Sequence, residues 1–378
     1  MNRQALLGNI KKVVVKVGTS SITKEGYEVD TEFMDSVARQ VKALRNRGIQ
    51  VIVVTSGAIG IGMDAMGGHP KPKEIPIRQA AASVGQSILM QKWNDSFGKV
   101  GLTIAQILLT YDFYSDRTRF LNLRNTMETL LDHDVIPIVN ENDALCIKEI
   151  EAYFGDNDTL SSMVASKMES ELLIILSDVE GLYDRNPVIY KDKANLIQEV
   201  HAITKEVESY ASKDMKGKGV GGMRTKIEAA KICCLAGCHM VIANHSIEDV
   251  ILRVVAGEDI GTIFVAEGDV RKSKMRWILL SHSSGTVEVD EGAKNALLRH
   301  MGLLPKGIVS VSGSFEPGDV VNIVQGGEVF AKGIIEYDSR DLGLVKGLHS
   351  NDIEKTLGYC RHGNVIRGEN LALLKEKS

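Results

Sequence analysis

The sequence contains no apolar run long enough to cross a lipid bilayer, so no membrane-spanning helix is predicted. The segment formed by residues 1–12 is short and polar, and it lacks the apolar core of a signal peptide. A formal net charge of −4 over 378 residues gives no large excess of either sign, which argues against a general nucleic-acid or membrane surface. These absences predict a cytoplasmic protein.

Cysteine is also scarce. The five cysteines are an odd number in a large chain, which fits a reducing cytoplasm better than a disulfide framework. Cys233, Cys234 and Cys238 lie near His239 and His245, but no paired Cys-x2-Cys spacing is present. The alanine-rich surroundings predict a buried helix, in which cysteine acts as a small apolar residue. No protein metal ligands are therefore predicted.

Three well-known catalytic motifs are missing. The chain has no Gly-x4-Gly-Lys-Ser/Thr loop, no Gly-x-Gly-x-x-Gly after a first strand, and no Gly-x-Ser-x-Gly. These absences argue against a P-loop nucleotidase, a dinucleotide-binding Rossmann domain, and a hydrolase with a nucleophile elbow.

Up to about residue 260 the chain alternates strand-like and helix-like segments. Asp30 and Thr31 are suited to cap a helix, and Gly48 to end it. Continuous apolar strands that alternate with helices are typical of a mostly parallel sheet covered on both faces, so we expect an α/β fold with three α/β/α layers. The apolar runs predict strands at 12–17, 49–55, 103–109, 135–139, 172–176 and 239–243.

The pattern changes near residue 260, which predicts a catalytic domain over 1–260 and a linker over 261–284. From residue 285 the strands are short and punctuated by glycine, with one helix at 292–300. We expect residues 285–367 to form a small β-rich barrel or pseudo-barrel, followed by a tail at 368–378.

Two polar clusters lie close together in the sequence. An apolar strand at 135–139 runs into Asn140-Glu141-Asn142-Asp143, and Gly155-Asp156-Asn157-Asp158 follows shortly after. In open α/β sheets, ligands bind at the carboxyl ends of the strands. Amides and carboxylates together suit a ligand with an ammonium group and carboxylates, such as an amino acid. The alternative is two turns rich in Asn, Asp and Gly.

Lys16 lies in an apolar strand and is followed by Gly18 and three hydroxyl residues. A buried ammonium group needs an anion, and the glycine and hydroxyls behind it suit a phosphate. The alternative is that Lys16 reaches water at the strand end. A second phosphate candidate is the glycine-rich stretch 217–226, which leads into a helix predicted to start near Thr225 and contains Lys226. The alternative there is a flexible loop.

Two more strand ends carry polar groups. Ser56-Gly57-Ala58 offers backbone N–H groups at a strand-to-helix turn, although a simple tight turn explains it equally well. Ser177-Asp178 places a carboxylate after the strand at 172–176, where it could also cap a helix. Two separate lysines, two glycine-rich turns and acidic strand ends together indicate phosphoryl transfer by positioning and charge neutralisation.

The ordered set of motifs resembles the glutamate 5-kinases of the amino acid kinase family, and residues 285–367 resemble the PUA domain that many of them carry. The resemblance covers nearly the whole chain. The motifs that carry it are Lys16-Val17-Gly18-Thr19-Ser20, Thr55-Ser56-Gly57-Ala58-Ile59, Asn140-Glu141-Asn142-Asp143-Ala144, Gly155-Asp156-Asn157-Asp158 and Gly221-Gly222-Met223-Arg224-Thr225-Lys226.

The resemblance implies roles for individual residues. Lys16 and Lys226 would neutralise charge on the transferring phosphoryl group, and Asp158 would orient them. Ser56, Asp143 and Asn157 would hold L-glutamate. The residues that would line the ATP site are Lys16, Ser177, Asp178, Val220, Gly221, Gly222, Met223, Arg224, Thr225 and Lys226. A small hydroxyl residue is more usual where Arg224 stands, which affects the expected loop geometry and nucleotide affinity.

The resemblance also implies a reaction and partners. ATP would phosphorylate the side-chain carboxylate of L-glutamate to L-glutamyl 5-phosphate, the first step of proline synthesis. Magnesium would be held mainly by phosphate oxygens and water. Proline would be a feedback inhibitor at or near the glutamate site. A loop and helix at 67–91 would lie near that site and form the subunit contact of a homo-oligomer, a dimer or tetramer.

Other functions remain open from the sequence. Another acceptor, such as acetylglutamate, aspartate, carbamate or a nucleoside monophosphate, would suit the same fold, although the two polar clusters favour an amino acid with a free ammonium group. RNA binding through the PUA-like region is the alternative from a different class. Basic residues there are scattered among acidic ones, which argues against RNA binding as the main function.

Overall fold

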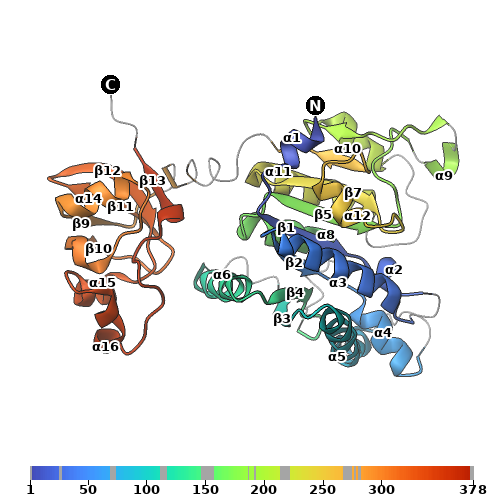
Figure 1. The fold of residues 1–378 in the computed structure, drawn as a ribbon, viewed down its shortest axis with the longest axis horizontal. Helices are drawn as coiled ribbons and strands as arrows, with labels where there is room; N and C mark the ends of the chain where they lie inside the picture. The colour runs from blue at the N-terminus through green and yellow to red at the C-terminus, as the bar shows by residue number, and fades with distance from the viewer. Residues whose placement is uncertain are drawn as a thin grey trace. The chain divides into compact units, whose positions relative to one another are not determined.

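The structure is a computed structural model that describes residues 2–24, 28–68, 74–110, 117–145, 157–185, 187–190, 193–212, 222–266, 275, 278–279 and 282–374. The chain divides into two compact units, one built from most of residues 1–270 and the other containing residues 271–378. Figure 1 shows the helices and strands of each unit.

The first unit is built around an eight-stranded sheet with the order β3-β4-β2-β1-β5-β7-β8-β6. All neighbouring strands pair in parallel except β7 and β8, which are antiparallel. The predicted mostly parallel sheet is therefore confirmed. Its strands are β1 (Lys12–Val17), β2 (Gln50–Val54), β3 (Ile104–Leu109), β4 (Ile136–Glu141), β5 (Leu172–Ser177), β6 (Glu199–Val200), β7 (His239–Asn244) and β8 (Thr262–Phe264).

Helices cover both faces of this sheet, so the predicted three layers are confirmed (Figure 1). Alternate residues of each strand enter opposite cores, as Val13 and Val14 of β1 do. One core includes side chains from α3, α5 and α12, and the other includes side chains from α6, α8 and α11. The helices of this part are α1 (Arg3–Leu7), α2 (Thr19–Ile22), α3 (Thr31–Asn46), α4 (Ala58–Ala65), α5 (Ile75–Lys99), α6 (Arg117–Asp132), α8 (Asn157–Lys167), α9 (Pro187–Tyr190), α10 (Lys205–Ser212), α11 (Met223–Ala236) and α12 (Val250–Val255).

Helix α3 forms for the reasons that the sequence indicates. The side chain of Asp30 accepts a hydrogen bond from the Phe33 backbone N–H and so satisfies one of the free donors of the first turn. Gly48 follows the helix with a φ of +77°, a conformation that glycine adopts without steric cost. Four apolar side chains at helical spacing are fully buried against the sheet: Met34, Val37, Val41 and Leu44.

Helices α4 and α5 are in direct backbone contact. A side chain at Gly62 would place its Cβ 1.8 Å from the carbonyl oxygen of Ala81, and one at Gly85 would lie 1.8 Å from that of Ala58. Only glycine fits at both positions. Since α4 follows β2 after Gly57, this contact fixes α5 close to the carboxyl end of β2.

Two element boundaries differ from the sequence prediction. Helix α11 begins at Met223, two residues before the predicted start, with Gly222 as its N-cap. Strand β8 lies inside the segment predicted as a linker, and it pairs with β7 as part of the large sheet. A strand of only three residues shows too little alternation to be recognised from sequence.

The second unit contains a five-stranded sheet with the order β10-β9-β11-β12-β13, in which only β9 and β11 are parallel. The expected β-rich region is confirmed, whereas α15, α16 and β13 were not predicted. The strands are β9 (Gly285–Val289), β10 (Ile308–Gly313), β11 (Val320–Gln325), β12 (Glu328–Ile334) and β13 (Leu371–Leu373). The helices and turns are α14 (Glu291–Leu298), α15 (Ser339–Val345), α16 (Ile353–Leu357), η5 (Pro305–Gly307), η6 (Ser350–Asp352) and η7 (Gly368–Asn370).

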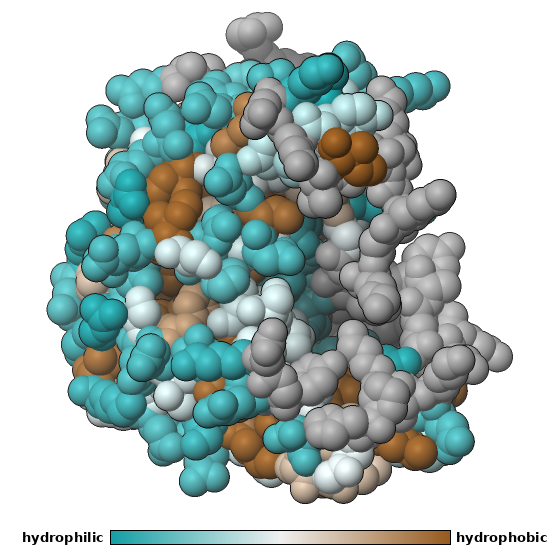
Figure 2. Space-filling view, turned by 90° about the vertical axis from the view of Figure 1, so that its right-hand side faces the viewer, coloured by the Kyte–Doolittle hydropathy of each residue, from teal (hydrophilic) through white to brown (hydrophobic). Residues whose placement is uncertain are grey.

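The coloured residues of the face in Figure 2 are mainly hydrophilic, and the hydrophobic ones among them lie in separate areas. Among the residues described, no helix has the length and apolar character needed to cross a membrane.

Candidate active site

The site begins at the carboxyl ends of the parallel strands. Strand β1 lies between β2 and β5, and β4 follows β2. Consecutive strands are thus added on opposite sides of β1, and such a switch point is where open α/β sheets bind ligands. Lys16 of β1 and Ser56 after β2 stand at this edge, as Asn140 of β4 does.

Lys16, Asp158 and Lys226 form one buried cluster. The Lys16 ammonium lies 2.5 Å from Asp158 Oδ1, and the Lys226 ammonium lies 2.9 Å from Oδ2. Asp158 is fully buried, and each lysine is only 6% exposed. The alternative in which Lys16 reaches water is therefore wrong. Three elements meet here, since the residues come from β1, the first turn of α8 and the first turn of α11.

The electrostatics of the cluster keep Asp158 ionised. Burial alone would raise the pKa of Asp158, but the charges of Lys16 and Lys226 outweigh burial and lower the pKa to about 2. Together these three largely buried side chains carry one net positive charge. A further anion would compensate that charge, because buried charges are tolerated where they are paired.

Asn157 lies next to Asp158 but has different partners. Its Nδ2 group donates to the backbone oxygen of Thr55 at 2.8 Å and to Ser56 Oγ at 2.7 Å. It also lies 3.1 Å from Asn140 Oδ1. Successive side chains of a helix point about 100° apart. At the start of α8, Asp158 therefore contacts the two lysines while Asn157 contacts the amide cluster.

The turn after β2 supports this amide cluster. Gly57 has a φ of +102°, and its left-handed conformation turns the chain sharply from β2 into α4. The fully buried Thr55 accepts a hydrogen bond from Trp93 Nε1 at 3.1 Å, so α5 holds the strand end. The predicted tight turn is present, and it presents Ser56 to Asn157.

The nucleotide residues predicted from sequence are placed only in part. Ser177 is buried at the end of β5, and its Oγ lies 3.1 Å from Oδ1 of the exposed Asp178. Thr225 Oγ1 lies 2.8 Å from the oxygen of Gly222 and 3.3 Å from Asp158 Oδ2.

Other predicted residues have a less defined setting. Met223 is half-buried and Arg224 is exposed in the first turn of α11. Asp143 is half-buried in the turn after β4. Val220 and Gly221, like Gly155 and Asp156 of the second polar cluster, lie outside the described residues.

Sequence reasoning assigned no role to Gln86 or to the side chain of Asn140 itself. Asn140 is 2% exposed, and its Nδ2 donates to Gln86 Oε1 at 2.8 Å. Asn140 belongs to a polar cluster that the sequence revealed, so a signal for it existed. Gln86 is one polar residue in a long helix, and nothing in its spacing distinguishes it.

The donor set does not suit a metal ion held by the protein. Both oxygens of Asp158 face ammonium groups. Within the described ranges, no three His, Cys, Asp or Glu residues are grouped to hold a cation. Cys233 and Cys238 are buried, and burial raises the pKa of the Cys233 thiol, which therefore stays protonated like a small apolar group.

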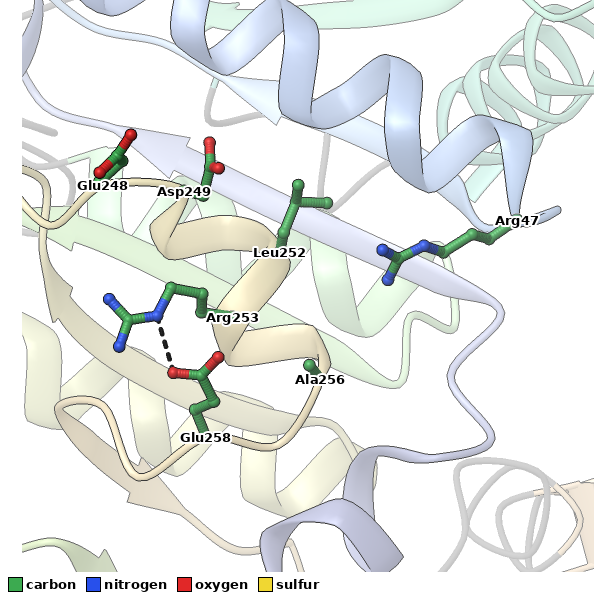
Figure 3. Close-up of a pocket in the computed structure, with 7 residues that line it drawn as sticks. All are labelled: Arg47, Glu248, Asp249, Leu252, Arg253, Ala256 and Glu258. Atoms are coloured by element: carbon green, nitrogen blue, oxygen red, sulfur yellow. Dashed lines mark hydrogen bonds and ion pairs between the residues drawn. The ribbon is translucent and has the colours of Figure 1, made fainter.

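A surface pocket of about 350 Å³ lies beside α12 and contains none of the predicted site residues (Figure 3). Its charged groups have both signs, and Arg253 donates from Nε to Glu258 Oε2 at 2.7 Å across it. This mixture of charges gives no preference for a phosphate. The pocket is lined by Arg47, Glu248, Asp249, Leu252, Arg253, Ala256 and Glu258.

Comparison with known proteins places this site in a family. Residues 11–244 match the model of the amino acid kinase family, and residues 285–357 match that of the PUA domain. A protein from Methanosarcina mazei named glutamate 5-kinase is 54% identical over 381 residues, covering 99% of both chains. Another of that name from Caldanaerobacter subterraneus is 44% identical, covering 96% of this chain and 98% of its own.

The chain therefore belongs to the amino acid kinase family, and within it to the relatives named glutamate 5-kinase. The resemblance drawn from the motifs, including the PUA domain, is confirmed. Among solved structures, UMP kinase from Bacillus anthracis aligns with 68% of this chain and 97% of its own, at 15% identity and a TM-score of 0.47.

Proposed function

We propose that the protein transfers the γ-phosphoryl group of ATP to the side-chain carboxylate of L-glutamate, giving ADP and L-glutamyl 5-phosphate, the first step of proline biosynthesis. The observation that carries the proposal is the buried Lys16–Asp158–Lys226 cluster, one residue away from the amide cluster at Asn157. The full-length relatives named glutamate 5-kinase support the same activity.

The chemistry needs no covalent enzyme intermediate. An oxygen of the glutamate side-chain carboxylate, already ionised, attacks the γ-phosphorus, and the bond from that phosphorus to the β–γ bridging oxygen breaks. Lys16 and Lys226 neutralise the charge on the transferring group and on the departing ADP. Asp158 stays a carboxylate throughout, since its pKa is about 2, and it holds both ammonium groups in place. It therefore positions the lysines and transfers no proton.

ATP would enter as its magnesium complex, with the cation held by phosphate oxygens and water. Both oxygens of Asp158 face ammonium groups, so this carboxylate would not hold the cation in this arrangement. Ser177, the last residue of β5, and Asp178 after it would line the nucleotide site together with the start of α11. Ser56, Asp143 and Asn157 would hold glutamate.

The test is an ATP-dependent assay with glutamate, acetylglutamate and aspartate as competing acceptors, in which hydroxylamine traps the acyl phosphate. We expect hydroxamate mainly from glutamate; its absence would refute the proposal. In Asp143→Ala the apparent glutamate affinity should fall, and an unchanged affinity would show that the acceptor site is assigned wrongly.

We also propose that the protein is a cytoplasmic homo-oligomer inhibited by proline. Proline carries the ammonium and α-carboxylate groups of glutamate, so the same amide cluster could hold it. Met66 at the end of α4 and Ile77 and Val84 on α5 are exposed apolar side chains, which supports a subunit contact at 67–91. Light scattering of Val84→Glu would test the contact, because a charge there should lower the oligomer mass.

We propose that catalysis resides in residues 1–260 and that residues 285–367, the PUA domain, act in regulation or assembly, with 261–284 as the connection and 368–378 as a tail. All predicted site residues lie in the first of these segments, which supports the division. Insertion of a protease site between residues 267 and 284, followed by cleavage, should leave hydroxamate formation measurable. Complete loss of activity with both fragments folded would contradict the division.

A further inference from the structure

A chain of three side-chain amides joins α5 to the predicted glutamate residues. Asn140 donates from Nδ2 to Gln86 Oε1 at 2.8 Å, and Asn140 Oδ1 accepts from Asn157 Nδ2 at 3.1 Å. The same Nδ2 of Asn157 faces Thr55 O and Ser56 Oγ. Gln86 lies seven residues before Trp93, about two helical turns, so both reach the strand ends from one face of α5.

The direction of each amide in this chain is determined by its neighbour. A carboxamide has one donating end and one accepting end. Because Gln86 Oε1 accepts, Asn140 must turn its Nδ2 toward it and its Oδ1 toward Asn157. Asn157 turns its Nδ2 inward, toward Asn140 Oδ1 and toward the backbone oxygen of Thr55, which can only accept. A rotation of the Asn140 amide by 180° would place oxygen against oxygen at Gln86 and nitrogen against nitrogen at Asn157.

Gln86 has a second feature that points to a specific use of its oxygen. Its Nε2 group is buried and has no hydrogen-bond partner among the described residues. A buried donor without a partner is unfavourable and rare. A hydrocarbon side chain of similar length would avoid this cost, so the benefit of glutamine here lies in the accepting Oε1.

We propose that Gln86 is a positioning residue for the amino-acid acceptor: it orients Asn140, and through Asn140 it orients Asn157, so that Asn157 presents Oδ1 to the ammonium group of the substrate. With the two hydrogens of Nδ2 shared among the oxygens of Thr55, Ser56 and Asn140, Oδ1 is the end of the Asn157 amide left for a ligand. An oxygen suits an ammonium group, whereas an NH₂ group in its place would repel it. This inference rests on the proposed glutamate activity.

The experiment compares Gln86→Met, which removes the acceptor, with Gln86→Glu, which keeps an acceptor and has no orphan donor. In Gln86→Met we expect the KM for glutamate to rise about tenfold, the loss expected when a buried donor loses its partner, while the KM for ATP stays constant. Gln86→Glu should stay within about threefold of the unaltered protein. Asp35→Asn removes the ion pair that Lys99 of the same helix makes with α3, outside segment 67–91, and is the matched control.

A second acceptor separates positioning from general damage. Glutarate has both carboxylates of glutamate but no ammonium group, so kcat/KM for glutarate should be the same in Gln86→Met and in the unaltered protein. An equal loss with glutarate and glutamate would overturn the inference, as would an unchanged KM for glutamate in Gln86→Met. If Gln86→Met does not fold, a tenfold rise in the glutamate KM of Gln86→Glu would overturn it. Absence of hydroxamate from the unaltered protein would instead refute the proposed function itself.

Discussion

Replacement of Asp158 by asparagine tests the central cluster most directly. The change keeps the shape of the side chain and removes its charge. Two ammonium groups, with side chains 7% and 8% exposed, would then surround a neutral amide. Removal of one partner from a buried ion pair costs about 3–5 kcal/mol, because the remaining charge is left unpaired. We expect the free energy of unfolding of Asp158→Asn to fall by about that amount.

The kcat of Asp158→Asn should change more than its KM for glutamate. Without the carboxylate, Lys16 and Lys226 repel each other and no longer point at one place, so the stabilisation of the transferring phosphoryl group weakens. Loss of one such electrostatic contact typically lowers kcat by about 10²–10³-fold. The KM for glutamate should change less, because the contacts of Asn157 with Ser56 and Thr55 do not involve the carboxylate.

The assay is steady-state hydroxamate formation, with urea unfolding of the same samples. Asp35→Asn is the matched control, because it removes an ion pair in which the Lys99 side chain is 58% exposed and that of Asp35 is 32% exposed. A surface pair of this kind contributes about 0–1 kcal/mol, and kcat should not change. A kcat for Asp158→Asn within threefold of the unaltered protein would refute the reasoning that the carboxylate organises the two lysines.

Three further predictions concern stability. The pKa of Asp158 is lowered from 3.8 to about 2, so the ionised carboxylate adds about 2 kcal/mol to the free energy of unfolding above pH 4. This contribution is lost as the pH falls through 2. Acid unfolding of Asp158→Asn should lack this component, and an acid transition identical to that of the unaltered protein would contradict the prediction. Thr262→Val should lower the free energy of unfolding in urea by about 2 kcal/mol, because the buried Thr262 Oγ1 accepts from Leu182 N at 2.7 Å and donates to Ile197 O at 2.6 Å; a loss below about 0.5 kcal/mol would contradict it. Gly85→Ala should lower the free energy of unfolding, measured by heating, by about 3 kcal/mol, because its Cβ would meet the Ala58 oxygen. Gly98→Ala on the same helix has open space around it and should not destabilise the protein. Equal effects of the two substitutions would refute the close contact of α4 and α5.

Much of the architecture could be predicted because it rests on local patterns. The apolar run of β1 and the cap and apolar spacing of α3 can be recognised from neighbouring residues alone. The bounds of both elements were predicted to within a residue or two. Lys16 was recognisable as a site residue because a cation in an apolar strand needs a nearby anion.

What could not be predicted depends on contacts between distant segments. Asp158 pairs with Lys16 across 142 residues of sequence, and only the resemblance to a family suggested that pair. The role proposed for Gln86 depends on its hydrogen bond with Asn140, which the packing of α5 on the sheet brings near. The contact of Gly62 with Ala81 likewise exists only once α4 and α5 cross. Periodicity within a segment contains no information on such encounters.

The start of α8 has a mechanical consequence for control of the enzyme. Asn157 and Asp158 are consecutive residues of one rigid helix, so a displacement of its first turn disturbs acceptor binding and lysine alignment in the same movement. A molecule that shifts this turn would therefore raise KM and lower kcat together. Substitutions at Asn157, by contrast, could alter the choice of acceptor while the adjacent carboxylate continues to hold Lys16 and Lys226. A mutation can therefore change acceptor selectivity without changing the rate, although a movement of the helix would change both.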